Sequence, residues 1–177
     1  MSEKHPESPR EERLSRGYDR MMERVKANID QAGDKAVPSL HRNIEQAREK
    51  AVELGELTRE EADKVAMYLQ RDLQDAARYI NETGTDLRDW LKIDLELIED
   101  RMLDAMFGVA DQTRLQMLQF QEELAEHSLW HTGEVTGPGA LRCTGCGEEI
   151  HFHHTGKIPP CPACHGTDFQ RPGPEEE

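Results

Sequence analysis

The chain has 177 residues, of which 33% are charged and only 5% aromatic, and its formal net charge is −14. This composition predicts solvated helices around a thin core, in one domain or two small ones. The acidic balance disfavours direct binding to nucleic acid, whose phosphates would be repelled. We find no apolar run long enough for a secretory signal near the N-terminus or for a membrane span elsewhere, and we therefore expect a cytoplasmic protein that does not enter a membrane.

Three helices with apolar residues at intervals of three and four are predicted between residues 14 and 81. The first fades near Gly33, and Gly55 ends the second. The third starts at Thr58, which with Glu61 has the sequence pattern of a capping box. The short connections favour antiparallel neighbours. The three apolar stripes are Leu14, Tyr18, Met21, Val25, Ile29 and Ala32; Leu40, Ile44, Ala47, Ala51 and Leu54; and Ala62, Val65, Leu69, Leu73, Ala76 and Ile80.

A fourth helical pattern extends with little interruption from Thr85 to about Ser128 and contains no proline. A straight helix over 85–128 would span more than about 60 Å, so we expect either a bend near Gly108 or an extended coiled coil. Further apolar residues widen its apolar surface, and these either fill the core or leave a face for self-association. They are Trp90, Leu97, Phe107, Met117 and Phe120.

The chain contains four cysteines, which form two Cys-x-x-Cys motifs separated by fourteen residues. Each motif directs two thiolates at one centre, and two motifs on opposing hairpins supply the four ligands of a tetrahedral zinc site. We therefore predict one Zn²⁺, with iron as the less favoured ion. The predicted ligands are Cys143, Cys146, Cys161 and Cys164.

Two disulfides, a thioredoxin-like redox pair and unliganded thiols are the other interpretations of these cysteines. A reducing cytosol disfavours disulfides, and a thioredoxin motif needs a βαβ context that the sequence lacks. Residues 131–171 are too few to fold by apolar burial alone, so the metal must supply much of their folding free energy. We expect loss of the metal, for example in Cys161→Ser, to melt this segment and to leave the helices largely intact.

The segment around the cysteines is predicted to form a three-stranded, rubredoxin-like ribbon with a small core of Leu141, Ile150, Phe152 and Phe169. The glycines of residues 133–139 indicate tight turns at the junction into this ribbon, because no Gly-Lys-Ser/Thr motif follows them. Gly147 suits a left-handed turn beneath the sulfurs.

Three histidines near the cysteines could be extra ligands or catalytic bases. Strand alternation directs His151 and His153 toward water, and His154 follows them. Four thiolates already fill a tetrahedral site and leave no open position for a catalytic water. We therefore predict surface histidines, a structural metal and no enzymatic activity.

A set of segments extends over both the helices and the ribbon: residues 54–59, 71–73, 131–135, Gly137, Gly139, Leu141, the two cysteine motifs and 169–171. Together they resemble a family of bacterial zinc-ribbon-containing proteins of unknown function. The resemblance spans about residues 14–171 and is most specific in the ribbon. It implies a helical N-terminal region, a ribbon with zinc ligands at the four cysteines, and no assigned activity. This chain has His165 where the family usually has a glycine.

The predicted fold is mainly α, an elongated antiparallel helical bundle or coiled coil followed by a small C-terminal β zinc ribbon. The expected boundaries are a flexible tail over 1–12, the helical domain over 13–130, the zinc ribbon over 131–171 and an acidic flexible tail over 172–177.

The first functional hypothesis is a non-enzymatic adaptor, whose helices assemble or dock while the ribbon presents a rigid hairpin to a protein partner. The second is electron transfer through iron in the same four-sulfur site. The third is a factor that joins a nucleic-acid machine through protein contacts. Homo-oligomers through the helices are also expected.

Overall fold

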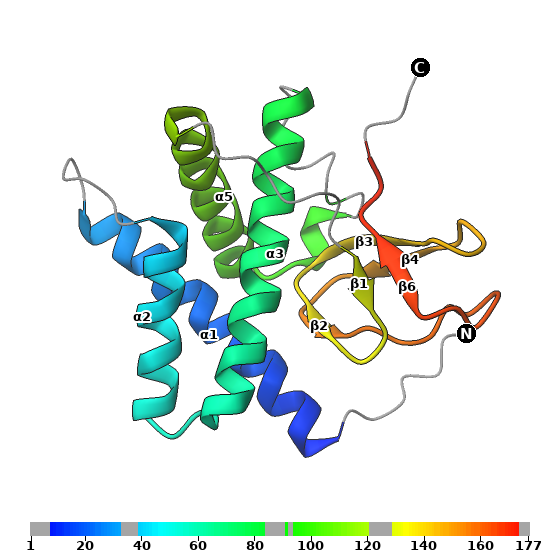
Figure 1. Ribbon diagram of the computed structural model, residues 1–177, viewed down its shortest axis with the longest axis horizontal. Coiled ribbons are helices and arrows are strands. Elements are labelled where there is room, and N and C mark those ends of the chain that lie inside the picture. Colours follow the sequence, from blue (N-terminus) through cyan, green and yellow to red (C-terminus); the bar gives the residue numbers. More distant parts are fainter. Residues whose placement is uncertain (1–7, 33–38, 84–90, 92–93, 121–128, 174–177) are drawn as a thin grey trace.

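The computed structural model describes residues 8–32, 39–83, 91, 94–120 and 129–173. The helical elements are α1 (Pro9–Ala32), α2 (Leu40–Glu53), α3 (Arg59–Thr83), the 3₁₀ turn η1 (Leu95–Leu97) and α5 (Asp100–Phe120). The strands are β1 (Trp130–His131), β2 (Val135–Thr136), β3 (Gly139–Cys143), β4 (Glu149–Phe152), β5 (Gly156–Lys157) and β6 (Asp168–Gln170). Figure 1 shows the strands gathered beside α3, with α2 and α5 away from them. The mainly helical fold with a C-terminal ribbon is confirmed.

The ends of the first three helices follow the local signals in the sequence. Gly55 has φ of +68°, the left-handed conformation that ends α2. The Thr58 hydroxyl accepts the backbone N–H of Glu61, whose carboxylate accepts the N–H of Thr58, so the capping box is confirmed. Helix α1 begins at Pro9, inside the segment 1–12 predicted as a tail, because proline suits the first turn of a helix. The rest of both predicted tails, residues 1–7 and 174–177, lies outside the described residues.

Helices α1 and α2 are antiparallel, as the short connections predicted (Figure 1). Arg24 binds Glu56 through both carboxylate oxygens, and four residues later Asn28 meets Gln46. The predicted apolar stripes form most of the core. Leu54, the C-cap of α2, is 54% exposed, and Ala32 at the end of α1 is only partly buried and outside the core cluster. The largest fully buried side chains of the helices are Tyr18, Met21, Met22, Leu69, Leu73 and Leu91.

The prediction of one helical stretch from 85 to 128 is wrong within the described residues. Helix α5 starts only at Asp100, and the 3₁₀ turn η1 precedes it. The cause is Asp94, whose carboxylate accepts the backbone N–H of Glu96 at 3.1 Å. An aspartate that binds a nearby N–H competes with helical hydrogen bonds and favours a turn. Residues 84–90 and 121–128 lie outside the described parts of the chain.

Gly108 lies inside α5, which continues on both sides of it, so the chain turns before α5 and not at this glycine. A Cβ atom at Gly108 would come within 2.4 Å of Cε of Lys26 on α1. The glycine therefore allows the Lys26 side chain to cross α5 at close range.

The apolar residues predicted to widen this helix have different positions. Phe107 packs against the helical core, and Leu97 is 59% exposed. Trp90 and the side chains of Met117 and Phe120 lie outside what the structure describes, so self-association through this surface stays a prediction.

The ribbon contains more strands than the three predicted. Strands β1, β6, β3 and β4 form one antiparallel sheet in that order, and β2 pairs with β5 in a second sheet. The predicted ribbon core is confirmed, with Leu141 and Phe169 fully buried and Ile150 and Phe152 partly buried. Trp130 joins that core, so the ribbon includes a residue that the predicted boundary assigned to the helices.

The small β2–β5 sheet connects the ribbon to the helices. Both strands contact α1, and β2 also contacts α3. Val135 on β2 belongs to the helical core and not to the ribbon core. Residues 133–139 do contain turns, with positive φ at Gly133 and Gly139, but they also form a contact surface between the two parts of the fold.

Candidate metal centre and its link to the helices

The first Cys-x-x-Cys motif forms a tight turn between β3 and β4. The backbone N–H of Gly147 donates to the carbonyl of Cys143 at 2.9 Å, and the N–H of Cys143 donates to the carbonyl of Glu148 at 2.8 Å. Gly147 has φ of +81°, the left-handed turn that its position predicted.

The second motif repeats these hydrogen bonds residue for residue. The N–H of His165 donates to the carbonyl of Cys161 at 2.9 Å, and the N–H of Cys161 donates to the carbonyl of Gly166 at 2.9 Å. His165 therefore occupies the position of Gly147 in the first turn, and it adopts φ of +60°. The turn has the left-handed geometry although the residue is not glycine.

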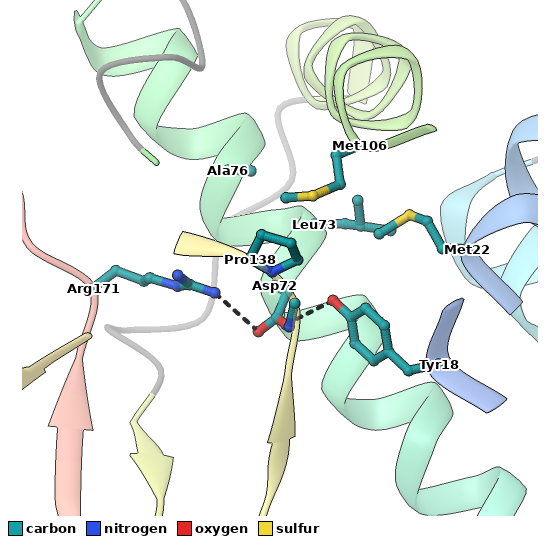
Figure 2. Close-up of a pocket in the computed structure, with 9 residues that line it drawn as sticks. Tyr18, Met22, Asp72, Leu73, Ala76, Met106, Pro138 and Arg171 are labelled. Carbon is teal, nitrogen blue, oxygen red and sulfur yellow. Dashed lines mark hydrogen bonds and ion pairs between the residues drawn. The ribbon is translucent and has the colours of Figure 1, made fainter. Parts of the chain in front are cut away.

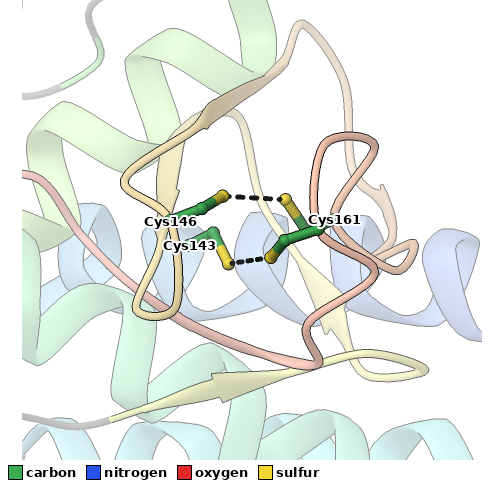
Figure 3. A group of neighbouring side chains, drawn as sticks. Cys143, Cys146 and Cys161 are labelled. Atoms are coloured by element: carbon green, nitrogen blue, oxygen red, sulfur yellow. Dashed lines mark hydrogen bonds between the residues drawn. The ribbon is translucent and has the colours of Figure 1, made fainter.

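The two turns bring the four predicted ligands together (Figure 3). All four Sγ atoms lie within 4.8 Å of one another. Across the two turns, Cys143 is 3.5 Å from Cys164 and Cys146 is 3.5 Å from Cys161. All four cysteines are free, and the first of each motif is buried while the second is exposed. The fold thus holds four sulfurs around one centre without a disulfide.

Backbone N–H groups and neighbouring sulfurs shift the pKa values of the thiols in opposite directions: the pKa of Cys161 is lowered, and those of Cys146 and Cys164 are raised. The N–H of Cys164, followed by that of Ala163, binds the sulfur of Cys161 and lowers the pKa of this thiol to about 7. At Cys146 the N–H of Glu148 also favours the thiolate, but hydrogen bonds shared with Cys164 and Cys161 outweigh it and raise the pKa to about 12. Sulfurs this close together therefore share protons unless a metal cation displaces those protons.

The donor set fits a tetrahedral metal ion. A metal–sulfur bond of about 2.3 Å for zinc requires sulfurs slightly less than 4 Å apart, close to the observed separations. Gly166 keeps this space open, because a Cβ atom there would lie 3.2 Å from the sulfurs of both Cys143 and Cys164. The four cysteines are a metal-binding arrangement.

The three nearby histidines are not part of the cluster. His151, His153 and His154 are exposed, and none of them belongs to the group of ligand atoms around the cysteines. The Nδ1 atom of His154 lies 3.2 Å from the backbone carbonyl oxygen of Thr155. Their prediction as surface residues is confirmed by this exposure.

A buried carboxylate on α3 connects the ribbon to the helical core (Figure 2). Asp72 is 3% exposed, and its Oδ2 atom accepts the hydroxyl of Tyr18 at 2.7 Å. Three more donors come from the ribbon: Trp130 Nε1 at 2.7 Å, Thr136 Oγ1 at 3.0 Å and Gly137 N at 2.9 Å. A buried charge is stable only with such partners, so the ribbon supplies most of what keeps Asp72 in the core.

Two arginines complete this cluster. Arg171, buried at 3% exposure, donates to the Ala140 carbonyl and to Thr136 and lies 3.9 Å from Asp72. Burial lowers the pKa of Arg171, and the charge of Asp72 opposes that shift. The guanidinium groups of Arg171 and Arg71 also lie over the Trp130 ring, 5.4 and 4.8 Å from its centre.

Further contacts join the same two parts of the fold. Arg71 on α3 pairs with Glu134, and Lys157 on β5 pairs with Glu11 on α1. The hydroxyl of Thr155 donates to Asp19 on α1.

No role was predicted for Asp72. A signal for it was nevertheless present, because Asp72 lies on the apolar stripe of α3, three residues after Leu69 and directly before Leu73. An acidic residue on a buried face indicates a hydrogen-bonded carboxylate. The identity of its donors, sixty residues away, depends on the tertiary fold.

Comparison with known proteins matches both the helices and the ribbon. The model of a family described as a zinc-ribbon containing domain matches residues 27–172. The chain belongs to this zinc-ribbon family. Uncharacterised YbeL proteins of Escherichia coli strains K12, O6:H1 and O157:H7 are each 30% identical over 117 residues, which cover 66% of this chain and 72% of the relative. No solved structure matches.

Membership of the zinc-ribbon family confirms the resemblance predicted from the sequence. The matched range includes α2, α3 and α5 together with all four cysteines, so the family is defined by both parts of the fold. Among the described helices, none is both long and apolar enough to cross a membrane.

Proposed function

We propose that this protein is a non-enzymatic zinc-binding adaptor, in which one structural Zn²⁺ holds the ribbon in the shape that a protein partner recognises. The observation that carries the proposal is the group of four cysteine sulfurs within 4.8 Å of one another. Four thiolates complete a tetrahedral shell and leave no position for a substrate or a reactive water. The metal therefore has a structural role: it stabilises the ribbon. Four thiols also require a reducing compartment, which supports a cytoplasmic location.

The tips of the two cysteine turns are the surface that this metal would make rigid. Residues 144–148 and 162–165 are exposed, while Cys143 and Cys161 beneath them are buried. A loop that is both exposed and fixed loses little entropy when it binds, which favours a docking role. The contacts through Asp72 fix the orientation of these tips relative to the helices.

Metal analysis of the purified protein tests the first part of the proposal. We expect one zinc per chain, and loss of the zinc in the variant Cys161→Ser. The competing electron-transfer function requires iron in the same site. A red protein with iron–thiolate absorption and no zinc would favour that function instead.

Affinity capture from nuclease-treated lysate tests the adaptor role. The wild type is compared with Ala163→Glu at an exposed turn tip and with Met67→Glu, a matched control at a side chain on α3 that is 66% exposed. We expect a protein partner that survives nuclease treatment and is lost only with Ala163→Glu. Loss of the partner on nuclease treatment would favour the nucleic-acid machine, and loss only with Met67→Glu would assign docking to the helices.

A further inference from the structure

Helix α1 carries five arginines on one face. Arg10, Arg13, Arg16, Arg20 and Arg24 follow one another at intervals of three or four residues, so their side chains project from neighbouring turns of the same side. At about 1.5 Å per residue this arginine face extends over roughly 20 Å. It belongs to a chain whose formal net charge is −14.

The carboxylates that pair with this face lie mostly beneath it. Glu61 accepts Arg13 at 2.5 Å, and Glu56 accepts Arg24 at 2.7 Å. The Glu61 and Glu56 side chains are only 6% and 14% exposed, whereas Arg13 is 49% exposed. Solvent therefore meets guanidinium groups, and the carboxylates below hold them in place.

Arg16 is the most exposed member of the arginine face. Its side chain is 67% exposed, and its ion pair is a loose contact of 3.6 Å with Glu12. Such an exposed pair contributes little to stability, so this guanidinium group is free to exchange one carboxylate for another.

A surface hollow of about 280 Å³ opens within the arginine face. Gly17 lies in its wall, and a Cβ atom there would come within 2.7 Å of Leu57, so α1 lies tightly on the chain between α2 and α3. The charged lining is Arg13, Arg16, Arg20 and Glu56. Arg13 pairs with Glu61, Arg16 with Glu12 and Arg20 with Glu56. With Arg10 and Arg24, the arginine face has five arginines for these three carboxylates. The planar guanidinium groups match the geometry of further carboxylates.

We propose that the arginine face of α1 binds a short acidic segment of a protein partner, with one carboxylate of that segment in the hollow between Arg13, Arg16 and Arg20. A short peptide with a few carboxylates spans only this face. A long polyanion such as nucleic acid would extend into the acidic remainder of the molecule and be repelled. This surface is distinct from the turn tips of the ribbon. The inference rests on the proposed adaptor role and specifies that one segment of the partner is negatively charged.

The test measures binding of a fluorescein-labelled hexaglutamate peptide to the zinc-loaded full chain by fluorescence anisotropy at low salt. We expect saturable binding that weakens when sodium chloride is added. Arg16→Glu should weaken it by about fivefold, corresponding to about 1 kcal/mol. Arg16→Lys should weaken it less, because lysine keeps the positive charge but loses the planar guanidinium geometry. Circular dichroism checks that each variant is folded.

The matched control is Arg42→Glu, which makes the same charge change at an exposed position on the first turn of α2. We expect it to leave the peptide affinity nearly unchanged. An equal loss in both variants would show a general charge effect and overturn the proposal, as would the absence of saturable binding. A labelled ten-residue oligothymidylate is tested in the same way. If it binds more tightly than the hexaglutamate peptide and Arg16→Glu abolishes that binding, the arginine face is assigned to nucleic acid instead. None of these outcomes changes the metal analysis, so the zinc site is tested separately.

Discussion

The two cysteine turns have the same hydrogen bonds but different residues at the left-handed position. Gly147 adopts φ of +81° without a steric penalty, whereas His165 adopts φ of +60° with a Cβ atom. A non-glycine residue in this region costs about 1–2 kcal/mol in the folded state. The left-handed conformation of His165 therefore makes the second turn less stable than it would be with glycine at this position.

We expect His165→Gly to raise the free energy of unfolding of the zinc-loaded protein by about 0.5–1 kcal/mol, since the relieved strain exceeds the entropy that glycine adds to the unfolded chain. Gly147→Ala should lower it by about 1–2 kcal/mol. Urea denaturation of both variants measures these changes. A destabilised His165→Gly variant would mean that the imidazole makes contacts that outweigh its backbone strain.

A second residue that lowers stability is Asp19, a partly buried carboxylate on α1 that faces the ribbon. Burial raises its pKa from the ordinary 3.8 to about 6, although the hydrogen bond from Thr155 opposes this shift. As the pH rises from about 4 to 6, the unfolded chain releases this proton before the folded chain does. Asp19 therefore reduces stability progressively over this range, and the full reduction remains above pH 6.

Asp19→Asn should remove this reduction. We expect the variant to have a free energy of unfolding about 1–2 kcal/mol higher at pH 7, with a smaller gain at pH 5. Urea denaturation of zinc-loaded protein at both pH values measures the difference. Asp63→Asn, at an exposed carboxylate of α3, is the control and should give no comparable gain. An Asp19→Asn gain that is larger at pH 5 than at pH 7 would contradict the raised pKa.

At the scale of elements, α3 is the helix on which the ribbon is anchored. Its Asp72 accepts hydrogen bonds from β1, from β2 and from the residue after β2, and also from Tyr18 on α1. One carboxylate therefore positions three elements. Its removal would leave buried donors without an acceptor and would take a nearby negative charge from the buried Arg171.

We expect Asp72→Ala to lower the free energy of unfolding by about 3–5 kcal/mol. Asp63→Ala on the same helix, which removes a surface ion pair with Arg48, should cost less than about 1 kcal/mol. Thermal or urea denaturation of both variants separates the two roles. Equal effects would show that the donors around Asp72 find other partners.

At the scale of the whole molecule, the helices and the ribbon depend on each other. The ribbon supplies Val135 to the helical core and most of the donors to Asp72. The sequence led us to expect that the helices stay largely intact when the metal is lost. This interface instead predicts that they lose stability, because a melted ribbon withdraws those groups from α1 and α3.

We expect a chelator that removes the metal to lower the midpoint of the helical thermal transition by about 10 °C. Circular dichroism at 222 nm during heating measures this midpoint. Readdition of zinc should restore the midpoint. In Asp72→Ala the same treatment should cause a smaller shift, because the main connection is already absent. An unchanged midpoint in the wild type would show that the ribbon folds independently of the helices.

Local rules in the sequence predicted much of this structure. The cysteine spacing identified the four sulfurs that meet, and the capping box and apolar stripes located the first three helices, because each of these features depends on residues within a few positions. The turn at Asp94 and the role of Gly108 were not predictable in this way. The first depends on one side chain outcompeting a helical pattern, and the second on Lys26, which lies eighty residues away in the sequence.

The same limit applies to the contacts between ribbon and helices. Asp72 could be identified as unusual on its apolar stripe, but its donors Trp130 and Thr136 could not be assigned without knowing where β1 and β2 lie. For the same reason, residues 133–139 were predicted as a junction, since two-residue strands carry too little pattern to indicate a packing surface.

The contacts of α1 also have a consequence for the order of folding during synthesis. Asp19 is bound by Thr155 and Glu11 by Lys157, so the partners lie 136 and 146 residues apart in the chain. When α1 leaves the ribosome, the groups that cover this side of it have not yet been made. Tyr18 and Asp72 likewise lack their contacts with Gly137 and its neighbours until the ribbon has been synthesised. The nascent chain must therefore keep a partly uncovered helical core until the ribbon emerges and takes up its metal, which makes metal binding by the ribbon a step in the maturation of the helices themselves.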